Sequence, residues 1–585
     1  MLLGVISLSL FANVMGVEGI DGNEVDVLPL AKQFVNRDWI AGDWYLNQQA
    51  GYRFLFQVVF GNLINSLGFL AGALTGRLFC FSLISLGLTF IGKALRLNPL
   101  VLALSIFCFV YPRIPRSLIE SCFSSLDIKS AILALSIVGI ILFVTFKSFK
   151  NARLWLPYLL LLLCFILFVA AQNSGQGIIA KESVVSGLEA KAPAYGFAML
   201  GIAALLWQRY RWMVLLLGIA TSFHVLVGGY GFLCALGTLA STDGFKPIAI
   251  KRQLYCLAIY LIGSIWAIRP VLAQVFETAQ NAEVSHSFIY VFLRLPHHLN
   301  SATWPQNWWL TFSAYLLILL VSLYVIRANE AIHQEIKLSA SVLGKLALIS
   351  IIPFLLGVAI APLDSEGKLL QYYPFRLGDV FLPLVACLLF ATALDQTFKK
   401  YWKRLFFIGF CAFYLVLCIK IRAIQAASEI HTLRQFPVAD PQRAELYTWI
   451  KRNTPKQSRF FTSPSEMNDF TWVTERATIA KLKFLPQQKQ PIIEWYTRLT
   501  DLNGGQSVWP DDVGAGYDVW VDAGQPLDEN YKRLTLETVT ALMAQYEADY
   551  FVTDRYHQLA LDVAFENDDY IVYWQPLKIP TVSGS

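Results

Sequence analysis

Residues 18–51, EGIDGNEVDVLPLAKQFVNRDWIAGDWYLNQQAG, decide how the chain is organised. They follow directly on an apolar run, residues 2–17, and carry six acidic residues interleaved with Trp and Tyr. Carboxylates are costly beside hydrocarbon unless they line a wet cavity, whereas Trp and Tyr favour the headgroup level of a bilayer. The stretch therefore predicts a functional loop at a membrane surface.

Composition supports a membrane setting for this loop. The 585 residues are 56% hydrophobic and only 15% charged, with a mean hydropathy of +0.50, which is far more apolar than a soluble globular protein needs. Residues 425–585 hold 15 Lys and Arg against 22 Asp and Glu, a net charge of −7, whereas residues 1–424 hold 32 against 19, a net charge of +13. The asymmetry predicts a transmembrane domain over residues 1–424 and a soluble domain over residues 425–585.

Apolar runs predict about thirteen transmembrane helices, since a span needs about 20 apolar residues and roughly 17 still suffice. The predicted spans are residues 2–17, 76–95, 98–111, 128–146, 154–171, 192–207, 212–227, 228–241, 254–273, 308–326, 342–361, 375–394 and 405–421. Short basic loops between them favour the cytoplasm, which places the first outer loop, residues 18–75, and the C-terminal domain outside the inner (plasma) membrane. Within that loop, residues 52–74 are apolar and predict a helix that lies along the surface or re-enters the membrane.

The sequence pattern of the C-terminal domain predicts a small α/β unit. Residues 441–453 predict a helix with Asp440 as its N-cap, and residues 491–502 and 536–546 have helical patterns. Short β-rich runs at 459–462, 548–553 and 570–574 alternate with them. The fold class is thus mostly α, a polytopic α-helical membrane protein with an extracytoplasmic α/β domain.

Four carboxylates in the first outer loop are candidate catalytic groups. Sugar transfer from a lipid phosphate to a hydroxyl needs a carboxylate that takes the acceptor proton, often beside a second acid or a metal. Asp38 and Asp43 lie five residues apart in RDWIAGDWYL, whereas Glu24 and Asp26 lie nearer the first span. A solvated loop whose acids simply avoid the cytoplasm is the alternative.

The segment YYPFRLGDVFLPL, residues 372–384, opens a predicted span with Arg376 and Asp379 three residues apart. An Arg at that depth suits a lipid phosphate, which it can bind bidentately. A structural ion pair with Asp379 is the alternative. We expect phosphate binding for Arg376 and a structural role for Asp379.

Other polar residues fall on the predicted outer face. RLPHHLNSATWPQNWW, residues 294–309, gathers Arg294, His297 and His298, which could bind a phosphate or hydroxyls or could belong to an interfacial aromatic loop. His224 lies at a span end beside Gly228-Gly229, and Lys181 lies in a Gly- and Ser-containing loop. These five residues are candidate substrate-binding groups, with plain hydrogen bonding or solvated charge as the alternative.

The pattern resembles the GT-C superfamily of membrane glycosyltransferases, which includes oligosaccharyltransferases, protein mannosyltransferases and aminoarabinose transferases. The acid-bearing first outer loop, the basic residue Arg77 in TGRLFC at the start of the second span, the number of spans and an outer domain opening with LYTWIKRNTP are all similar. GDWYLN, LPHHLNSATWP, YPFRLGD and ADYFVTDR look similar to segments of an uncharacterised bacterial branch. The WWDYG motif of oligosaccharyltransferases and the Asp-Glu pair of mannosyltransferases are missing from the corresponding places, so N-glycosylation is not expected.

The resemblance implies transfer of a sugar, with inversion, from a polyprenyl-phosphate donor to a lipid, glycan or protein acceptor on the outer face. For this sequence, the resemblance implies that Asp43 or Asp38 is the general base, and that Glu24 or Asp26 is the next candidate. It also makes Arg77 a substrate-binding candidate. The family often uses a divalent metal such as Mg or Mn, but the sequence shows no ligand set for one. Membrane lipid is an expected partner and nucleic acid is not.

Two other functions fit the same architecture. A transporter or flippase would use the outer acids for gating or coupling, although the sequence shows no internal duplication. A non-catalytic scaffold for envelope assembly would keep the frame without the chemistry.

Overall fold

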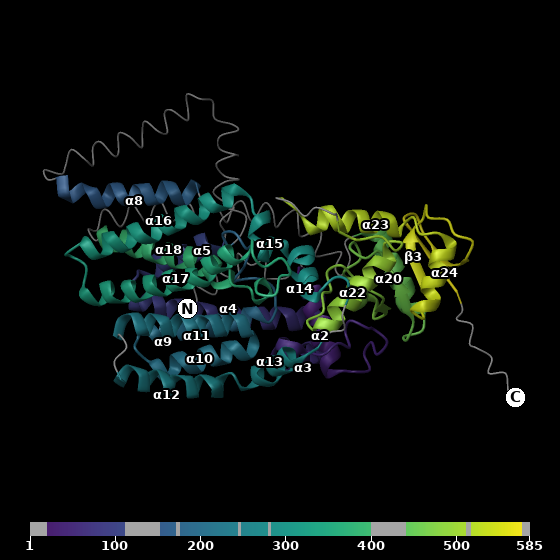
Figure 1. The fold of residues 1–585 in the computed structure, drawn as a ribbon, viewed down its shortest axis with the longest axis horizontal. Coiled ribbons are helices and arrows are strands. Elements are labelled where there is room, and N and C mark those ends of the chain that lie inside the picture. Colours follow the sequence, from purple (N-terminus) through teal and green to yellow (C-terminus); the bar gives the residue numbers. More distant parts are fainter. Residues whose placement is uncertain are drawn as a thin grey trace, which may run out of the picture.

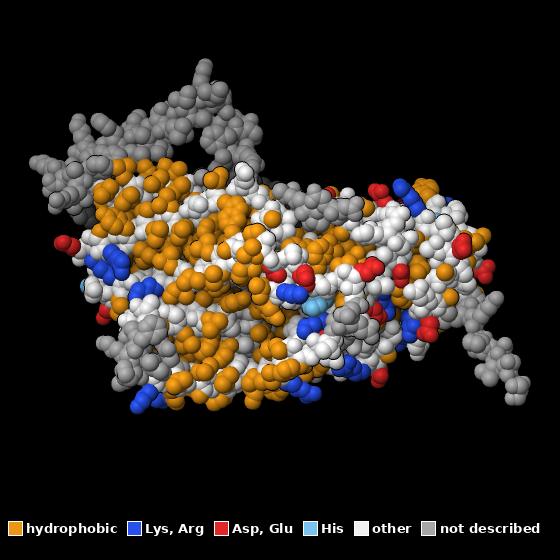
Figure 2. Space-filling view, in the orientation of Figure 1, with side chains coloured by type: hydrophobic (Ala, Val, Ile, Leu, Met, Phe, Trp, Pro, Cys, Tyr) orange, Lys and Arg blue, Asp and Glu red, His pale blue; other side chains and the backbone are white. Residues whose placement is uncertain are grey.

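A computed structural model of the chain describes residues 20, 22–110, 152–170, 176–243, 247–278, 282–398, 440–509 and 516–575. Figure 1 shows the long helices side by side along the longest axis, with the sheet-containing C-terminal domain at one end. Hydrophobic side chains cover much of the helical part in the face shown in Figure 2. The predicted spans 2–17, 128–146 and 405–421 and the predicted domain boundary at 424–425 lie outside the described residues.

The helical part is a multi-pass bundle. Among the described residues, five helices are long and apolar enough to cross a membrane, namely α4 (Phe69–Ala94), α11 (Val225–Asp243), α16 (Gln306–Ala328), α17 (Gln334–Ile360) and α18 (Arg376–Thr397). Shorter apolar helices pack among them: α5 (Pro99–Val110), α8 (Ala152–Ala170), α9 (Lys191–Leu206) and α10 (Tyr210–Phe223). Helix α18 is central, since almost all of its apolar window is buried between α16, α17 and their neighbours. The predicted total of about thirteen spans stays a prediction.

One predicted span is wrong as a single straight helix. Residues 254–273 belong to α12 (Pro247–Gly263) and α13 (Ile265–Phe276), which are bent by 87° at the break between them. A Cβ atom added at Gly263 would lie 2.7 Å from the carbonyl oxygen of Leu215, so the close approach of α12 to α10 requires glycine there. Helix α13 leaves the direction of α12 with much of its apolar surface exposed.

The first outer loop forms helices at the junction between the bundle and the C-terminal domain (Figure 1). They are α2 (Glu24–Val35), the 3₁₀ turn η1 (Gly51–Arg53) and α3 (Phe54–Leu67). Gly61 of α3 fits against the carbonyl oxygen of Ala31 on α2, where an added Cβ would lie only 2.2 Å away. Gly68, with φ of +79°, turns the chain from α3 into α4, which begins at Phe69 and not at the predicted residue 76.

Several short elements complete this junction. They are α14 (His286–Phe288), the π-helix η2 (Ile289–Arg294), α15 (Pro296–Leu299), and the 3₁₀ turns η3 (Ser301–Thr303) and η4 (Leu370–Tyr372). Ser285 caps α14 through the backbone N–H of Phe288, and π-helical turns often accompany functional sites.

The C-terminal domain confirms the predicted α/β elements. Its helices are α20 (Pro441–Asn453), α21 (Phe470–Thr474), α22 (Lys489–Leu502), the π-helix η5 (Val519–Gly524), α23 (Gln525–Tyr531) and α24 (Leu536–Gln545). Its strands are β1 (Arg459–Phe461), β2 (Ala477–Thr478), β3 (Tyr550–Asp554), β4 (Asp562–Glu566) and β5 (Tyr570–Trp574). Asp440 caps α20 as predicted, because its side chain accepts the backbone N–H of Gln442 at 3.0 Å.

The five strands form one mixed sheet of order β2-β1-β3-β5-β4. Strands β2, β1 and β3 are parallel, and β5 pairs antiparallel with both β3 and β4. Apolar cores lie around Trp495 and around Tyr447, and the first of them includes Ile289 and Leu293 of η2. The C-terminal domain is therefore packed onto the junction elements that carry the site.

Candidate active site

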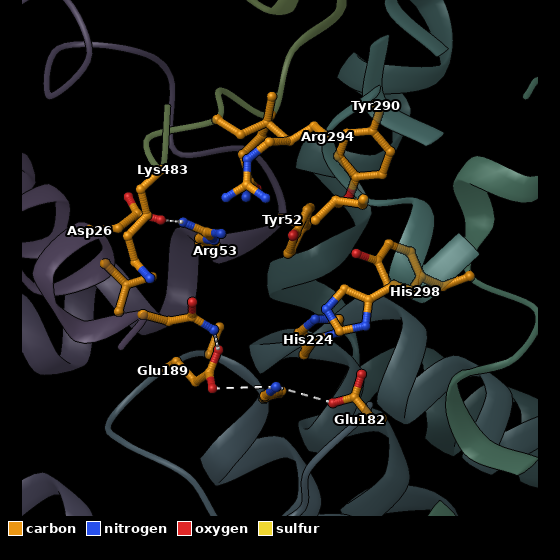
Figure 3. A pocket seen from close by; sticks show the side chains of 18 of the residues that line it. Asp26, Tyr52, Arg53, Glu182, Glu189, His224, Tyr290, Arg294, His298 and Lys483 are labelled. Atoms are coloured by element: carbon orange, nitrogen blue, oxygen red, sulfur yellow. Dashed lines mark hydrogen bonds and ion pairs between the residues drawn. The ribbon is translucent and has the colours of Figure 1, made fainter. Parts of the chain in front are cut away.

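A polar cleft of about 260 Å³ opens where α2, η1, the loop before α9, η2, α15, the start of α18 and the C-terminal domain meet. Its charged lining consists of five cations, Arg53, Lys191, Arg294, Arg376 and Lys483, and three carboxylates, Asp26, Glu182 and Glu189. His224, His297, His298 and three tyrosines add neutral polar groups. Figure 3 shows the side chains of both domains converging on this space.

Asp26 is the one predicted carboxylate of the first outer loop that lines the cleft. It lies in the first turn of α2, 7% exposed, and accepts a short hydrogen bond from the Tyr45 hydroxyl. Arg53 Nη1 lies 3.5 Å from its second oxygen. Burial raises the pKa of Asp26 above its ordinary value, although Arg53 and Tyr45 oppose the rise. A carboxylate on the wall of the cleft is placed to take a proton from a bound substrate.

Arg376 lines the cleft from the first turn of α18. Its Nη1 donates to Nε2 of His224 at 3.2 Å and lies 3.4 Å from Oε2 of Glu182, while the ring of Tyr373 lies 4.2 Å below the guanidinium. Its Nε is buried and makes no hydrogen bond. A buried donor without a partner is costly, so a ligand oxygen in the cleft would satisfy it.

Asp379 fixes the loop that carries Glu182. Its carboxylate accepts backbone N–H groups from Ile179 at 2.7 Å and from Ala180 and Glu182 at 3.0 Å each. The Asp379 carboxylate thus binds the backbone of the loop. The predicted alternative was an ion pair between Asp379 and Arg376. Three N–H donors on one carboxylate hold the loop at the cleft.

The remaining cations lie on the side of the C-terminal domain. Arg294 is 6% exposed, donates from Nε to the carbonyl oxygen of Leu482 at 3.0 Å and lies 4.8 Å from the ring of Trp520. Lys483 Nζ lies 5.4 Å from the same ring. Burial lowers the pKa of Arg294 from its ordinary value. Of the carboxylates among the described residues, none lies within ion-pair distance of Arg294.

His297 and His298 line the cleft as an adjacent pair whose ring centroids are 4.1 Å apart and whose planes are tilted by 45°. Nδ1 of His298 donates to the carbonyl oxygen of Ala180, which ties α15 to the same loop. Burial lowers the pKa of His298 to about 3 and that of His297 further still, so both rings are neutral at pH 7. They can donate and accept hydrogen bonds but bring no charge.

The structure does not bring the other predicted residues into the cleft. Glu24 and Arg77 form a buried ion pair, and Glu24 also accepts the backbone N–H of Leu188. Asp38 is exposed, and its carbonyl oxygen accepts Lys456 Nζ at 3.3 Å. Lys181 lies over the ring of Trp308 at 5.1 Å.

Asp43 links the first outer loop to the C-terminal sheet. Its carboxylate accepts the N–H of Leu46 at 2.8 Å and the N–H of Thr478 in β2 at 3.0 Å. It is 2% exposed, and burial raises its pKa to about 6. This geometry supports a structural role for Asp43, and a catalytic role for it stays a prediction.

A second, mostly apolar chamber of about 230 Å³ lies beside the polar cleft. The two cavities share the residues Tyr52, Tyr290, Tyr373, Arg376 and Gln487. The apolar wall comes from α11, α13 and α22, with Val225, Leu226, Val271, Val275 and Ile492. Val275 is 61% exposed, so the chamber reaches the apolar outer surface of α13.

The residues do not offer a metal site in the part of the chain that the structure describes. Within it, no three His, Cys, Asp or Glu side chains are placed to hold an ion. The cleft carboxylates are instead engaged by Arg53, Lys191 and Arg376. No step of the reaction proposed below is assigned to the divalent metal that the resemblance implies.

Comparisons with known proteins found a family match to part of the C-terminal domain and a similarity to a solved structure. A domain of unknown function, DUF6798, matches residues 442–502, which include α20 and α22. The search of curated proteins returned no match. Among solved structures, the crystal structure of ArnT from Cupriavidus metallidurans bound to undecaprenyl phosphate matches 98% of this chain and 97% of its own, at 11% identity and a TM-score of 0.42. The functional inferences below rest on the cleft itself, because a similarity at this TM-score carries no chemistry across.

Sequence reasoning did not single out Tyr52, Arg53, Tyr290, Tyr373 and Lys483 as site residues, although all five line the cleft. Arg53 ends a 3₁₀ turn that precedes an apolar helix, and a lone cation at such a boundary was one signal for it. Lys483 lies 301 residues after Glu182 in the chain, and only the packing of the C-terminal domain brings it near.

Proposed function

We propose that this chain transfers a sugar from a polyprenyl-phosphate donor to a hydroxyl-bearing lipid, glycan or protein acceptor at the outer face of the plasma membrane. The observation that supports it is the place of Arg376, a buried cation on the wall common to a polar cleft and an apolar chamber. A polyprenyl phosphate likewise has a charged phosphate end and an apolar isoprenoid tail. Its phosphate would bind Arg376, its isoprenoid tail would lie in the chamber, and its sugar would face the cleft.

In this proposal, different cleft residues carry out different parts of the reaction. Asp26 takes the proton of the acceptor hydroxyl, whose oxygen forms a bond to the anomeric carbon from the side opposite the phosphate. The bond between the anomeric carbon and the phosphate oxygen breaks, with inversion, and polyprenyl phosphate leaves with the electron pair. Arg376, whose Nε has no partner in the resting cleft, stabilises the charge that grows on the leaving phosphate. His224 and Glu182 hold the guanidinium in place.

Lipid mass spectrometry of the purified protein tests this proposal. We expect a polyprenyl phosphate to co-purify with the wild type and with Asp26→Asn, and to fall by roughly tenfold or more in Arg376→Gln, because a charge-assisted hydrogen bond is lost. Arg327→Gln, an exposed position at the end of α16, is the matched control.

Sugar transfer from a labelled polyprenyl-phosphate donor should survive in the control and fall in both cleft variants. Absence of any polyprenyl phosphate from the wild type, or coupled ion flux in proteoliposomes without sugar transfer, would overturn the proposal in favour of a scaffold or a transporter.

A further inference from the structure

Helix α13 turns almost at right angles to the bundle. Its axis is bent by 87° from that of α12 across the break at Ser264. Helix α12 packs along α10, and Figure 1 shows both of them running along the longest axis of the molecule with the other long helices. The long helices of the described bundle are apolar enough to cross a membrane, so their common direction is close to that of the membrane normal. Helix α13 therefore runs nearly parallel to the plane of the membrane.

The bend lies at the level of the polar cleft. The Ser222 hydroxyl, in the last turn of α10, donates to the carbonyl oxygen of Gly263 at 2.8 Å. The residue that follows α10 is His224, whose side chain lines the cleft. Charged groups such as those of the cleft are costly inside hydrocarbon, so this end of α12 lies at the boundary of the membrane and α13 begins there.

One side of α13 is bound to the rest of the protein. Val271 lines the apolar chamber, and Gln274 Nε2 donates to the carbonyl oxygen of Gln487 at 3.2 Å. Glu277, directly after the helix, accepts the backbone N–H of Lys489 at 2.9 Å. These contacts hold α13 between the chamber and the start of α22.

The other side of α13 is an exposed apolar stripe. Its members are Ile265, Ile268, Leu272, Val275 and Phe276, which recur at helical spacing. All five are exposed, and Phe276 is 78% exposed. A helix with one side packed on the protein and such a stripe on the other needs an apolar partner for the stripe.

Two observations indicate that this partner is lipid. Exposed apolar side chains at the end of α12, Leu261 and Ile262, lead directly into the stripe, and α12 belongs to the membrane bundle. The single charged residue within α13 is Arg269, whose apolar stem can stay with the stripe while its guanidinium reaches headgroup phosphates. An amphipathic helix in the membrane plane buries its apolar face about 5–10 Å into the boundary between headgroups and acyl chains.

We infer that α13 is an interfacial helix, and that its apolar stripe binds phospholipid in the leaflet on the cleft side of the membrane. Val271, on the protein side of the same helix, then holds the apolar chamber beside that leaflet at the depth of the headgroups. This place for α13 is independent of the reaction proposed above, because it concerns bulk phospholipid and not a donor.

Fluorescence quenching in proteoliposomes tests the inference. The fluorescent residue acridonylalanine replaces Leu272 or Phe276 in the full chain, which is reconstituted in phosphatidylcholine brominated either near the headgroup end or near the methyl end of its acyl chains. We expect bromine near the headgroup to quench both labels more strongly, by roughly twofold or more, because an interfacial helix stays at that boundary. Both side chains are exposed, so each label needs no repacking of the core.

Two other exposed positions calibrate the depth. Leu348 lies near the middle of α17, where bromine near the methyl end should quench more strongly. Tyr556, 86% exposed in the C-terminal domain, should be quenched by neither lipid.

Two results would overturn the inference. Stronger quenching of the α13 labels by bromine near the methyl end would mean that the helix enters the hydrocarbon as part of a span. Labels that neither lipid quenches would mean that the stripe lies in water or against protein, and concentration-dependent dimerisation of the purified chain would then assign it to a second copy.

Discussion

The Nη1 of Arg376 lies 3.4 Å from Oε2 of Glu182, joining the first turn of α18 to the loop that precedes α9. Glu182 also lies 3.2 Å from Lys191 Nζ, so a single carboxylate that is 3% exposed pairs with two cations. One acidic side chain therefore couples the stability of the junction to the geometry of the proposed phosphate site.

Replacement of Glu182 by Gln should destabilise the protein by about 3 kcal/mol, because it leaves the buried Arg376 without its carboxylate and Lys191 with Glu189 alone. Burial raises the pKa of Glu182, but Arg376 and Lys191 lower it by more, so the net shift is downward. A depressed pKa contributes stability that is present above the ordinary value of 4.5 and is lost as pH falls below it. Thermal unfolding in detergent should show that the gap between wild type and E182Q narrows from pH 6 towards pH 3. A gap that is constant with pH would contradict the ion-pair account.

Replacement of Asp26 by Asn should lower the rate of sugar transfer by roughly 10² or more, since a general base contributes typically 10²–10⁴-fold. Because the pKa of Asp26 is raised, the acid limb of kcat/KM in the wild type should have its midpoint above the ordinary carboxyl value of 3.8. The binding of donor lipid should change little. Asp38→Asn, at an exposed position of the same loop, is the control, and a loss of rate in D38N but not in D26N would contradict the assignment.

Replacement of Asp43 by Asn should weaken the link between the first outer loop and β2. Loss of an acceptor for the buried N–H of Thr478 or Leu46 should cost about 1–3 kcal/mol of stability while folded protein keeps its activity. The folded pKa of about 6 exceeds the ordinary 3.8, so the contribution of Asp43 is fully present below about pH 4 and declines as pH rises through 6. The stability gap between wild type and D43N should therefore narrow between pH 4 and pH 7. If the D43N variant has normal stability but no turnover, Asp43 is instead the general base.

Glu24 and Arg77 provide a fourth test, because this buried pair joins α2 to α4. Arg77→Met alone should cost about 3 kcal/mol or more, since it strands a buried carboxylate, whereas the double variant with Glu24→Gln should recover part of that loss. The coupling measured by the double-mutant cycle separates a structural pair from a substrate-binding Arg77. Additive effects, with a specific rise in KM for the donor, would support substrate binding.

The sequence predicted the type of most elements because periodicity is local. The strand at Tyr570–Trp574 and the N-cap at Asp440 follow from residues within a few positions of each other. The 87° bend after Gly263 was not predicted, and the close contact of that glycine with α10 joins residues that are far apart in the sequence.

The candidate site was predictable only in part, and for a similar reason. The sequence placed Asp26 and Arg376 on one face of the membrane, and the structure brings both to one cleft. The sequence favoured Asp43 or Asp38 as the base over Asp26, because a local pattern does not show what packs against each carboxylate. Asp43 is occupied by a backbone N–H of β2, 435 positions away in the sequence.

The apolar chamber provides the last prediction. Val271 of α13 and Leu226 of α11 both line the cavity that also contacts Arg376. Val271→Trp should fill space in a chamber of about 230 Å³, and it should raise the KM for a long-chain polyprenyl donor by roughly tenfold while leaving the KM for a water-soluble short-chain donor within about twofold. The phosphate site itself is unchanged in this variant, so the comparison isolates the tail. Leu272→Trp, at a neighbouring exposed position of α13, is the matched control. If V271W impairs both donors equally, the tail does not lie in this chamber and Arg376 would have to receive its phosphate from the cleft side.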